Sequence, residues 1–123
     1  MIVLDTSAAI ELLSGSEAGG RVKKLTTDDE IVITSLTVHE LLLGEDKAVI
    51  EFIRNTRVLP YDATAAAESA HMELELSRKG RLVNKMDILI AGVCAANKAR
   101  IISIDSDFSR IPGIDATIIG LRE

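Results

Sequence analysis

The sequence predicts an α/β fold in which a mostly parallel sheet of four to five strands is covered by helices on both faces. Short apolar runs at residues 2–4, 31–33 and 101–104 lack polar alternation, which is typical of strands buried on both sides. Longer stretches with helix-capping residues lie between these runs. With 123 residues, 47% of them hydrophobic, the chain is long enough to bury one core, so we expect a single domain over residues 1–123.

In the first half of the chain, short strands and helices are expected to alternate. Gly15 and Gly44 are expected to end helices, and Ser35 is a candidate N-cap. Gly19 and Gly20 weaken the second of the helices. The expected elements are a strand at residues 2–4, helices at 7–14 and 17–25, a strand at 31–33 and a helix from 35 to 43.

The second half continues the alternation, with Asp62 and Asn84 as candidate N-caps and Gly80 as a helix end. The expected elements are helices at residues 45–55, 62–79 and 84–99, strands at 57–61 and 101–104, and a short edge strand at 116–119. In sheets of this kind ligands bind beyond the carboxyl ends of the strands, so we look for chemistry at that edge.

Composition limits the choice of partner and compartment. A net charge of −5 argues against nucleic acid, and three aromatic residues cannot build a platform for stacking several bases. If the chain acts on RNA, a bound metal ion would have to supply positive charge. No apolar run reaches the roughly 20 residues that span a bilayer. The N-terminus does not resemble a signal peptide, and the lone Cys94 fits a reducing compartment, so we expect a cytoplasmic protein without a membrane partner.

Two aspartates follow buried strands directly. Asp5 comes after the run at residues 2–4, and Asp105 after the run at 101–104. If both strands are parallel, these carboxylates share one edge of the sheet. The alternative is that each aspartate merely caps the turn or helix that follows it.

Glu40 and Asp87 are two further acids in apolar surroundings. Glu40 shares a helical stripe with Leu36 and Leu43, both expected in the core, so its side chain should point toward the protein. A salt bridge to a lysine or arginine is the alternative for Glu40. Asp87 lies near the start of a helix that is apolar almost all round, where the alternative is a capping role at the third helical position.

Electrostatics links the four acids to a metal. Two carboxylates about 4 Å apart repel by roughly 4 kcal/mol at an effective dielectric of about 20, so a cluster of four needs a cation. Oxygen ligands without nearby histidine or cysteine favour Mg²⁺ or Mn²⁺. Such an ion polarises a phosphodiester and activates water for in-line attack.

The same residues carry a resemblance to a known family. The matching pieces are residues 4–7, Glu40-Leu41 followed by Gly44, residues 82–87 running into Ile90-Ala91, and residues 103–108. In this order and spacing the chain resembles the PIN-domain family, and within it the VapC-like toxin ribonucleases of prokaryotic toxin–antitoxin pairs. Two mild departures are Ser103, where threonine is frequent, and Gly92, where a second alanine is usual.

The resemblance implies a three-layer α/β/α sandwich and a Mg²⁺- or Mn²⁺-dependent endoribonuclease. By likeness, Asp5, Glu40, Asp87 and Asp105 form the catalytic, metal-binding quartet, and Asp107 is a further acid. Thr6, Ser7 and Ser103 are hydroxyls that orient ligands or water. The family also implies a homodimer and an antitoxin protein whose C-terminal segment lies over the acids.

Three basic residues precede Asp87 and are candidates for contacting an RNA backbone: Lys79, Arg81 and Lys85. A solvated helix end explains them equally well. Another reading of the chain is a catalytically silent PIN-like scaffold, which the presence of all four acids disfavours. A haloacid-dehalogenase-like phosphatase needs a second aspartate two residues after the first, where this chain has Ser7.

Overall fold

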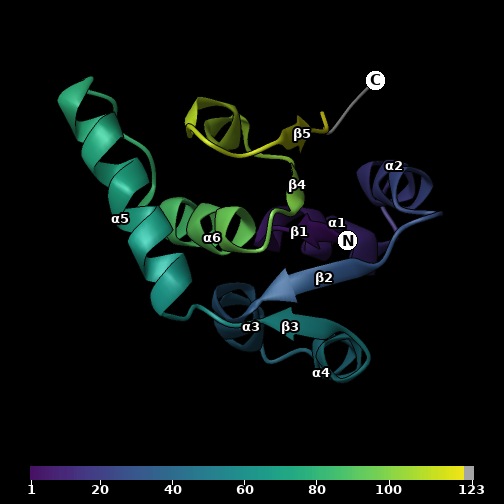
Figure 1. Cartoon of the computed structure of the whole chain (residues 1–123). Coiled ribbons are helices and arrows are strands. Elements are labelled where there is room, and N and C mark those ends of the chain that lie inside the picture. The colour runs from purple at the N-terminus through teal and green to yellow at the C-terminus, as the bar shows by residue number, and fades with distance from the viewer. Residues whose placement is uncertain (121–123) are drawn as a thin grey trace.

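The sheet has five parallel strands in the order β3-β2-β1-β4-β5 in the computed structural model, which describes residues 1–120 (Figure 1). The strands are β1 (Ile2–Leu4), β2 (Ile31–Thr34), β3 (Arg57–Leu59), β4 (Arg100–Ser103) and β5 (Ala116–Ile118). In the central strand, Val3 pairs with Val32 on one side and with Ile101 on the other. The predicted parallel sheet is therefore confirmed, including the short fifth strand at the edge.

Helices cover both faces of this sheet, and the alternation of side chains along each strand separates two cores. The helices are α1 (Thr6–Ser14), α2 (Glu17–Leu25), α3 (Ser35–Leu42), α4 (Lys47–Arg54), α5 (Ala63–Arg78) and α6 (Lys85–Ala96), with a 3₁₀ helix η1 (Ser106–Arg110). Val3 belongs to the core beneath α5, α6 and η1, whereas Ile2 and Leu4 belong to the core beneath α1, α2 and α4. Figure 1 shows α5 and α6 to the left of the sheet and α2 to its right. The three-layer α/β/α architecture is confirmed.

Several helix ends differ from the prediction because local caps decide them. Helix α3 is capped by Thr34 and not by Ser35: the Thr34 hydroxyl accepts the Thr37 amide at 3.2 Å. Ser35 instead accepts the Tyr61 amide at 3.0 Å. Helix α4 begins only after its cap, Asp46. The predicted helix to residue 99 was too long, since α6 ends at Ala96.

Two glycines allow neighbouring helices to approach closely. A Cβ added at Gly19 in α2 would lie 2.1 Å from the carbonyl oxygen of Glu11 in α1. A Cβ added at Gly92 in α6 would lie 2.6 Å from the carbonyl oxygen of Ala65 in α5. The absence of a second alanine at position 92 therefore has a packing reason. Within residues 1–120, no helix combines the length and apolar character that crossing a bilayer requires.

Candidate metal centre

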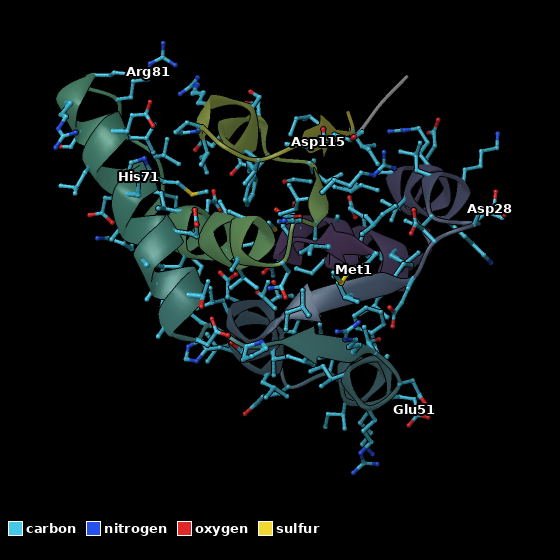
Figure 2. All side chains as sticks on the ribbon, in the orientation of Figure 1. Met1, Asp28, Glu51, His71, Arg81 and Asp115 are labelled. Atoms are coloured by element: carbon cyan, nitrogen blue, oxygen red, sulfur yellow. The ribbon has the colours of Figure 1, made fainter. Side chains whose placement is uncertain are left out.

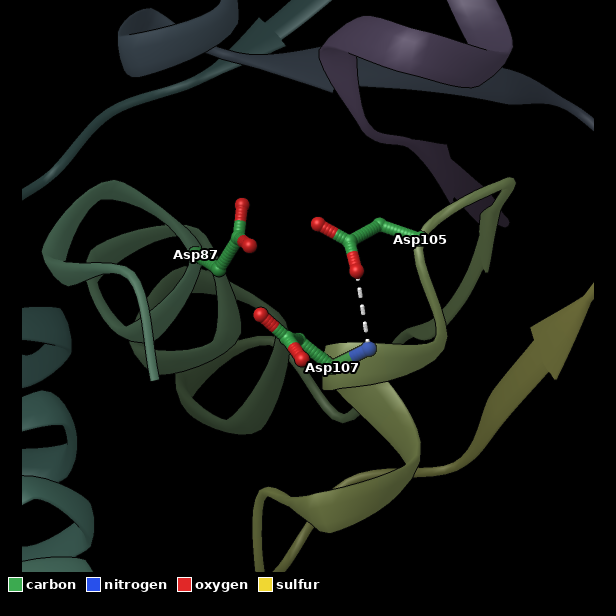
Figure 3. Close-up of side chains that lie close together, drawn as sticks. All are labelled: Asp87, Asp105 and Asp107. Atoms are coloured by element: carbon green, nitrogen blue, oxygen red, sulfur yellow. Dashed lines mark hydrogen bonds between the residues drawn. The ribbon is translucent and has the colours of Figure 1, made fainter. Parts of the chain in front are cut away.

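Three aspartates from two separate segments converge at the carboxyl edge of the sheet. Asp87 comes from the first turn of α6, and Asp105 and Asp107 from the segment after β4. Each offers a carboxylate oxygen, and these oxygens lie within 4.8 Å of one another. Figure 3 shows the three side chains pointing toward a common space. The Asp107 amide donates to Asp105 Oδ1 at 2.9 Å, which holds the two neighbours in place.

The charges in this acid cluster repel one another. Burial, followed by repulsion from Asp105 and Asp5, raises the pKa of Asp87 from 3.8 to about 7. Asp5 therefore lies close enough for its charge to affect the pKa of Asp87. Burial also raises the pKa of Asp5, against the opposing hydrogen bonds, with a smaller contribution from Asp105. A bound cation would relieve this repulsion.

Asp5 forms the buried side of the site, with only 3% of its surface exposed. Its carboxylate accepts hydrogen bonds from the Ala8 amide at 2.9 Å, Ser7 Oγ at 2.8 Å and Ser103 Oγ at 2.6 Å. The bond from Ala8 caps α1, and Asp105 caps η1 in the same way. For these two aspartates, capping and membership of the acidic site therefore occur together and do not exclude each other.

Asp87 is not the N-cap of α6 but lies in its first turn, where the capping alternative had placed it. The cap of α6 is Asn84, whose Oδ1 accepts the Met86 amide at 2.9 Å. Asp87 occupies the third helical position, as expected, but its carboxylate faces the other acids (Figure 3).

Glu40 is not part of the cluster of three aspartates, and its contact with the site is to Thr6, the residue after Asp5. The side chain is half-buried, and its Oε1 accepts a hydrogen bond from Thr6 Oγ1 at 2.5 Å. Within residues 1–120, no lysine or arginine forms an ion pair with it, so the salt-bridge alternative fails there. The helical stripe was partly wrong: Leu43 is 73% exposed because α3 ends before it, and the buried leucine is Leu41.

Each of the three hydroxyls singled out from the sequence contacts an acid. Thr6 bonds to Glu40, while Ser7 and Ser103 bond to Asp5. Ser103 Oγ also accepts the Asp105 amide at 2.8 Å, so one serine connects two aspartates. Sequence reasoning missed Thr37, whose hydroxyl lies 3.2 Å from that of Thr6. Its position three residues before Glu40, on the same helical face, was the available signal.

The basic residues before Asp87 are largely engaged with acids of α5. Lys85 Nζ lies 2.7 Å from Glu73, and Lys79 Nζ lies 3.4 Å from Glu75. Arg81 follows the end of α5 and is exposed (Figure 2). Exposed ion pairs of this kind contribute little free energy.

An apolar groove of about 300 Å³ adjoins Glu40. Besides Glu40 it is lined by side chains of α1, α3 and α4, among them Ile10, Leu13, Leu41 and Val49. Three exposed leucine and isoleucine side chains belong to the same helices: Ile10, Leu42 and Ile50. The groove therefore borders Glu40, whereas none of the three clustered aspartates lines it.

Comparison with known proteins gives consistent matches over nearly the whole chain. A family model described as the PIN domain matches residues 2–114. The tRNA(fMet)-specific endonuclease VapC of Shigella flexneri is 32% identical, over 91% of this chain and 92% of that protein. Ribonuclease VapC5 of Mycobacterium tuberculosis is 30% identical, over 90% and 87%.

Solved structures match the fold equally well. DNA-bound VapBC from Salmonella typhimurium gives a TM-score of 0.81 at 32% identity, covering 95% of this chain and 96% of that one. VapBC2 from Rickettsia felis, bound to a DNA fragment from its promoter, gives 0.82 at 21% identity, with coverage of 96% and 98%. At that lower identity the likeness concerns the fold alone.

Proposed function

Because the chain belongs to the PIN-domain family, we propose that it is a cytoplasmic Mg²⁺- or Mn²⁺-dependent endoribonuclease and the toxin of a toxin–antitoxin pair. We also propose that residues 1–123 form one PIN-like domain. The observation that carries the proposal is the convergence of Asp87, Asp105 and Asp107 at the sheet edge. The nearby charge of Asp5 also raises the pKa of Asp87. The ribonuclease relatives support the reaction class.

The donor set fits a hard dication. Every group in the acid cluster is a carboxylate, which favours Mg²⁺ or Mn²⁺ over softer metals. The raised pKa of Asp87 indicates negative charge that lacks compensation. We propose Asp5, Glu40, Asp87 and Asp105 as the residues that hold the ion, with Asp107 as an additional ligand or a ligand for bound water.

When bound, such an ion polarises the phosphodiester and lowers the pKa of the attacking water. The chain's own residues provide the positioning. Ser7 and Ser103 hold the Asp5 carboxylate in one orientation, and Ser103 also fixes the backbone of Asp105. Lys79, Arg81 and Lys85 are proposed to bind RNA phosphates, which sets the register of the substrate without reading its bases.

Two partners, an antitoxin and a second copy of this chain, are proposed from the similar solved structures and from the groove beside Glu40. Solved neighbours include VapBC toxin–antitoxin complexes. The groove beside Glu40 suits an amphipathic antitoxin segment that inserts apolar side chains and directs a basic residue at Glu40. A homodimer is the further expectation that the family supports.

The decisive experiment measures RNA cleavage by the purified chain. We expect cleavage with Mg²⁺ or Mn²⁺, none with EDTA, and loss in the Asp5→Asn and Asp105→Asn variants. Asp28→Asn is the matched control, because Asp28 is exposed beside α2, away from the acid cluster (Figure 2). Equal cleavage by wild type and Asp5→Asn would reject the proposed site.

A separate experiment tests the toxin assignment. The product of a small adjacent reading frame should form a complex with this chain and suppress its activity. Ile10→Glu, at an exposed side chain that lines the groove, should weaken that complex while the cleavage of RNA by the free chain persists. A complex of unchanged affinity would contradict the groove as the docking site.

A further inference from the structure

We propose that Thr37 is a positioning residue for Glu40: its buried hydroxyl fixes, through Thr6, the orientation of the Glu40 carboxylate. This inference rests on the proposed function, because it assigns Glu40 a share in binding the cation. It concerns a residue that touches neither the ion nor the substrate. Its effect must therefore pass along hydrogen bonds, and the spacing of the hydroxyls allows this.

A row of hydroxyls leads from the base of α3 to the site. Thr34 Oγ1 lies 3.5 Å from Thr37 Oγ1, and Thr37 Oγ1 lies 3.2 Å from Thr6 Oγ1. Thr6 Oγ1 in turn lies 2.5 Å from Glu40 Oε1. Thr34 and Thr37 are fully buried, so water does not compete for the contact between these two hydroxyls.

The direction of the bonds follows from counting protons. A threonine hydroxyl has one proton to donate and two lone pairs that accept. The carboxylate of Glu40 is the stronger acceptor, so the Thr6 proton goes to Glu40. Thr6 Oγ1 is also oriented as a donor toward Thr37 Oγ1, and Thr34 Oγ1 is a second donor toward the same oxygen, so Thr37 is the acceptor at the inner end of the row. The Thr6 hydroxyl is thereby held between the Thr37 oxygen and the Glu40 carboxylate.

A purely structural role explains Thr34 but not Thr37. Thr34 Oγ1 accepts the Thr37 amide and so caps α3. The Thr37 hydroxyl has only hydroxyl partners within residues 1–120, namely those of Thr34 and Thr6. Burying a hydroxyl costs free energy that a valine of almost the same shape would avoid. The hydroxyl is therefore best explained by what it holds.

What it holds is the junction between α1 and α3. Thr6 is the first residue of α1, directly after Asp5, whereas Glu40 lies in the last turn of α3. Thr6 donates to Oε1 of Glu40 and so restricts the rotation of the Glu40 carboxylate. Partners of this kind orient metal ligands, and their loss typically lowers metal affinity by about 10–100-fold.

The test is Mn²⁺ binding to the RNA-free protein, measured by calorimetric titration. Thr37→Val should raise the Mn²⁺ dissociation constant by about 3–10-fold. This is less than the effect of losing a group bonded directly to a metal ligand, because Thr37 is one hydrogen bond further from Glu40. Thr37→Ser, which keeps the hydroxyl, should restore the affinity. Thr26→Val is the matched control: its buried hydroxyl donates to the Val22 carbonyl at 2.9 Å, remote from the acids. This control should lower thermal stability and leave Mn²⁺ affinity unchanged.

The possible results distinguish a failure of the proposed role of Thr37 from a failure of the proposed function. If the wild type binds no Mn²⁺, the proposed function fails and the role of Thr37 fails with it. If the wild type binds and Thr37→Val binds equally well, only the role of Thr37 is rejected. In a Glu40→Gln background the Thr37→Val effect should vanish, and an effect that persists there would also reject it.

Discussion

Replacing Asp87 by asparagine tests whether the acid cluster is a strained cation site or a set of helix caps. In metal-free protein the pKa of Asp87 is raised from 3.8 to about 7 by burial and by its neighbours. Below pH 3.8 the folded and unfolded states both hold the proton. Between pH 3.8 and 7 the unfolded state loses it first, so the wild type becomes less stable as pH rises, and the loss is complete above pH 7.

The magnitude follows from this difference. A pKa raised by 7 − 3.8, or about 3, corresponds to an upper limit of about 4 kcal/mol at about 1.36 kcal/mol per pKa unit. Asp87 is only half-buried, and solvent screening reduces the figure to about 1–2 kcal/mol. In EDTA, Asp87→Asn should thus equal the wild type near pH 4 and exceed its unfolding free energy by about 1–2 kcal/mol at pH 8.

Urea denaturation with EDTA at pH 4 and pH 8 measures the effect, with Asp28→Asn as the control. Excess Mn²⁺ should reverse the order, because an ion at 100 times its dissociation constant stabilises the wild type by about 2.7 kcal/mol. A variant that is less stable than the wild type by the same amount at both pH values would refute the reasoning. That result would assign Asp87 to the helix dipole.

Three further predictions concern packing and RNA binding. Gly19→Ala should lower the unfolding free energy by about 1–3 kcal/mol, because the added Cβ would clash with the Glu11 carbonyl. Gly20→Ala meets open space and should raise the unfolding free energy by up to about 1 kcal/mol. Urea denaturation measures both changes. Gly92→Ala should also lower the unfolding free energy by about 1–3 kcal/mol and lower the melting temperature, because its Cβ would press on a carbonyl of α5. Arg81→Ala should weaken RNA binding and reduce its salt dependence by about one phosphate contact, measured by fluorescence anisotropy at several salt concentrations; an unchanged salt slope would remove Arg81 from the RNA path.

The fold was predictable because its signals are local. Apolar runs without alternation identify the strands, and Asp62 and Asn84 do cap the helices that follow them. The errors lie at helix ends, where competing caps decide: Thr34 is the cap of α3 and not Ser35. At the other end of α3, Leu43 was expected in the core but follows the last helical residue and is exposed.

The position of the acids was predictable only in part. Asp5 was expected at a strand end, and its place there follows from the parallel register of β1 and β4. Asp107 was given an auxiliary place, yet it belongs to the group of three because the 3₁₀ turn brings it back toward Asp105. The spacing of Thr37 and Glu40 on α3 was a local signal, but the contact of Thr37 with Thr6 joins residues 31 positions apart and could not be predicted from that spacing.

The connections that leave β1 and β4 depart toward opposite layers of the molecule. After β1 the chain enters α1, whose Ala8 and Ala9 pack in one core, whereas after β4 it enters η1, whose Phe108 packs in the other. The two segments therefore diverge where Asp5 and Asp105 lie. Solvent access accordingly increases from Asp5, which is buried, through Asp87 to the exposed Asp105. An incoming polyanion would meet the exposed Asp105 carboxylate first. A cation bound there would offset the repulsion between the carboxylate and the polyanion.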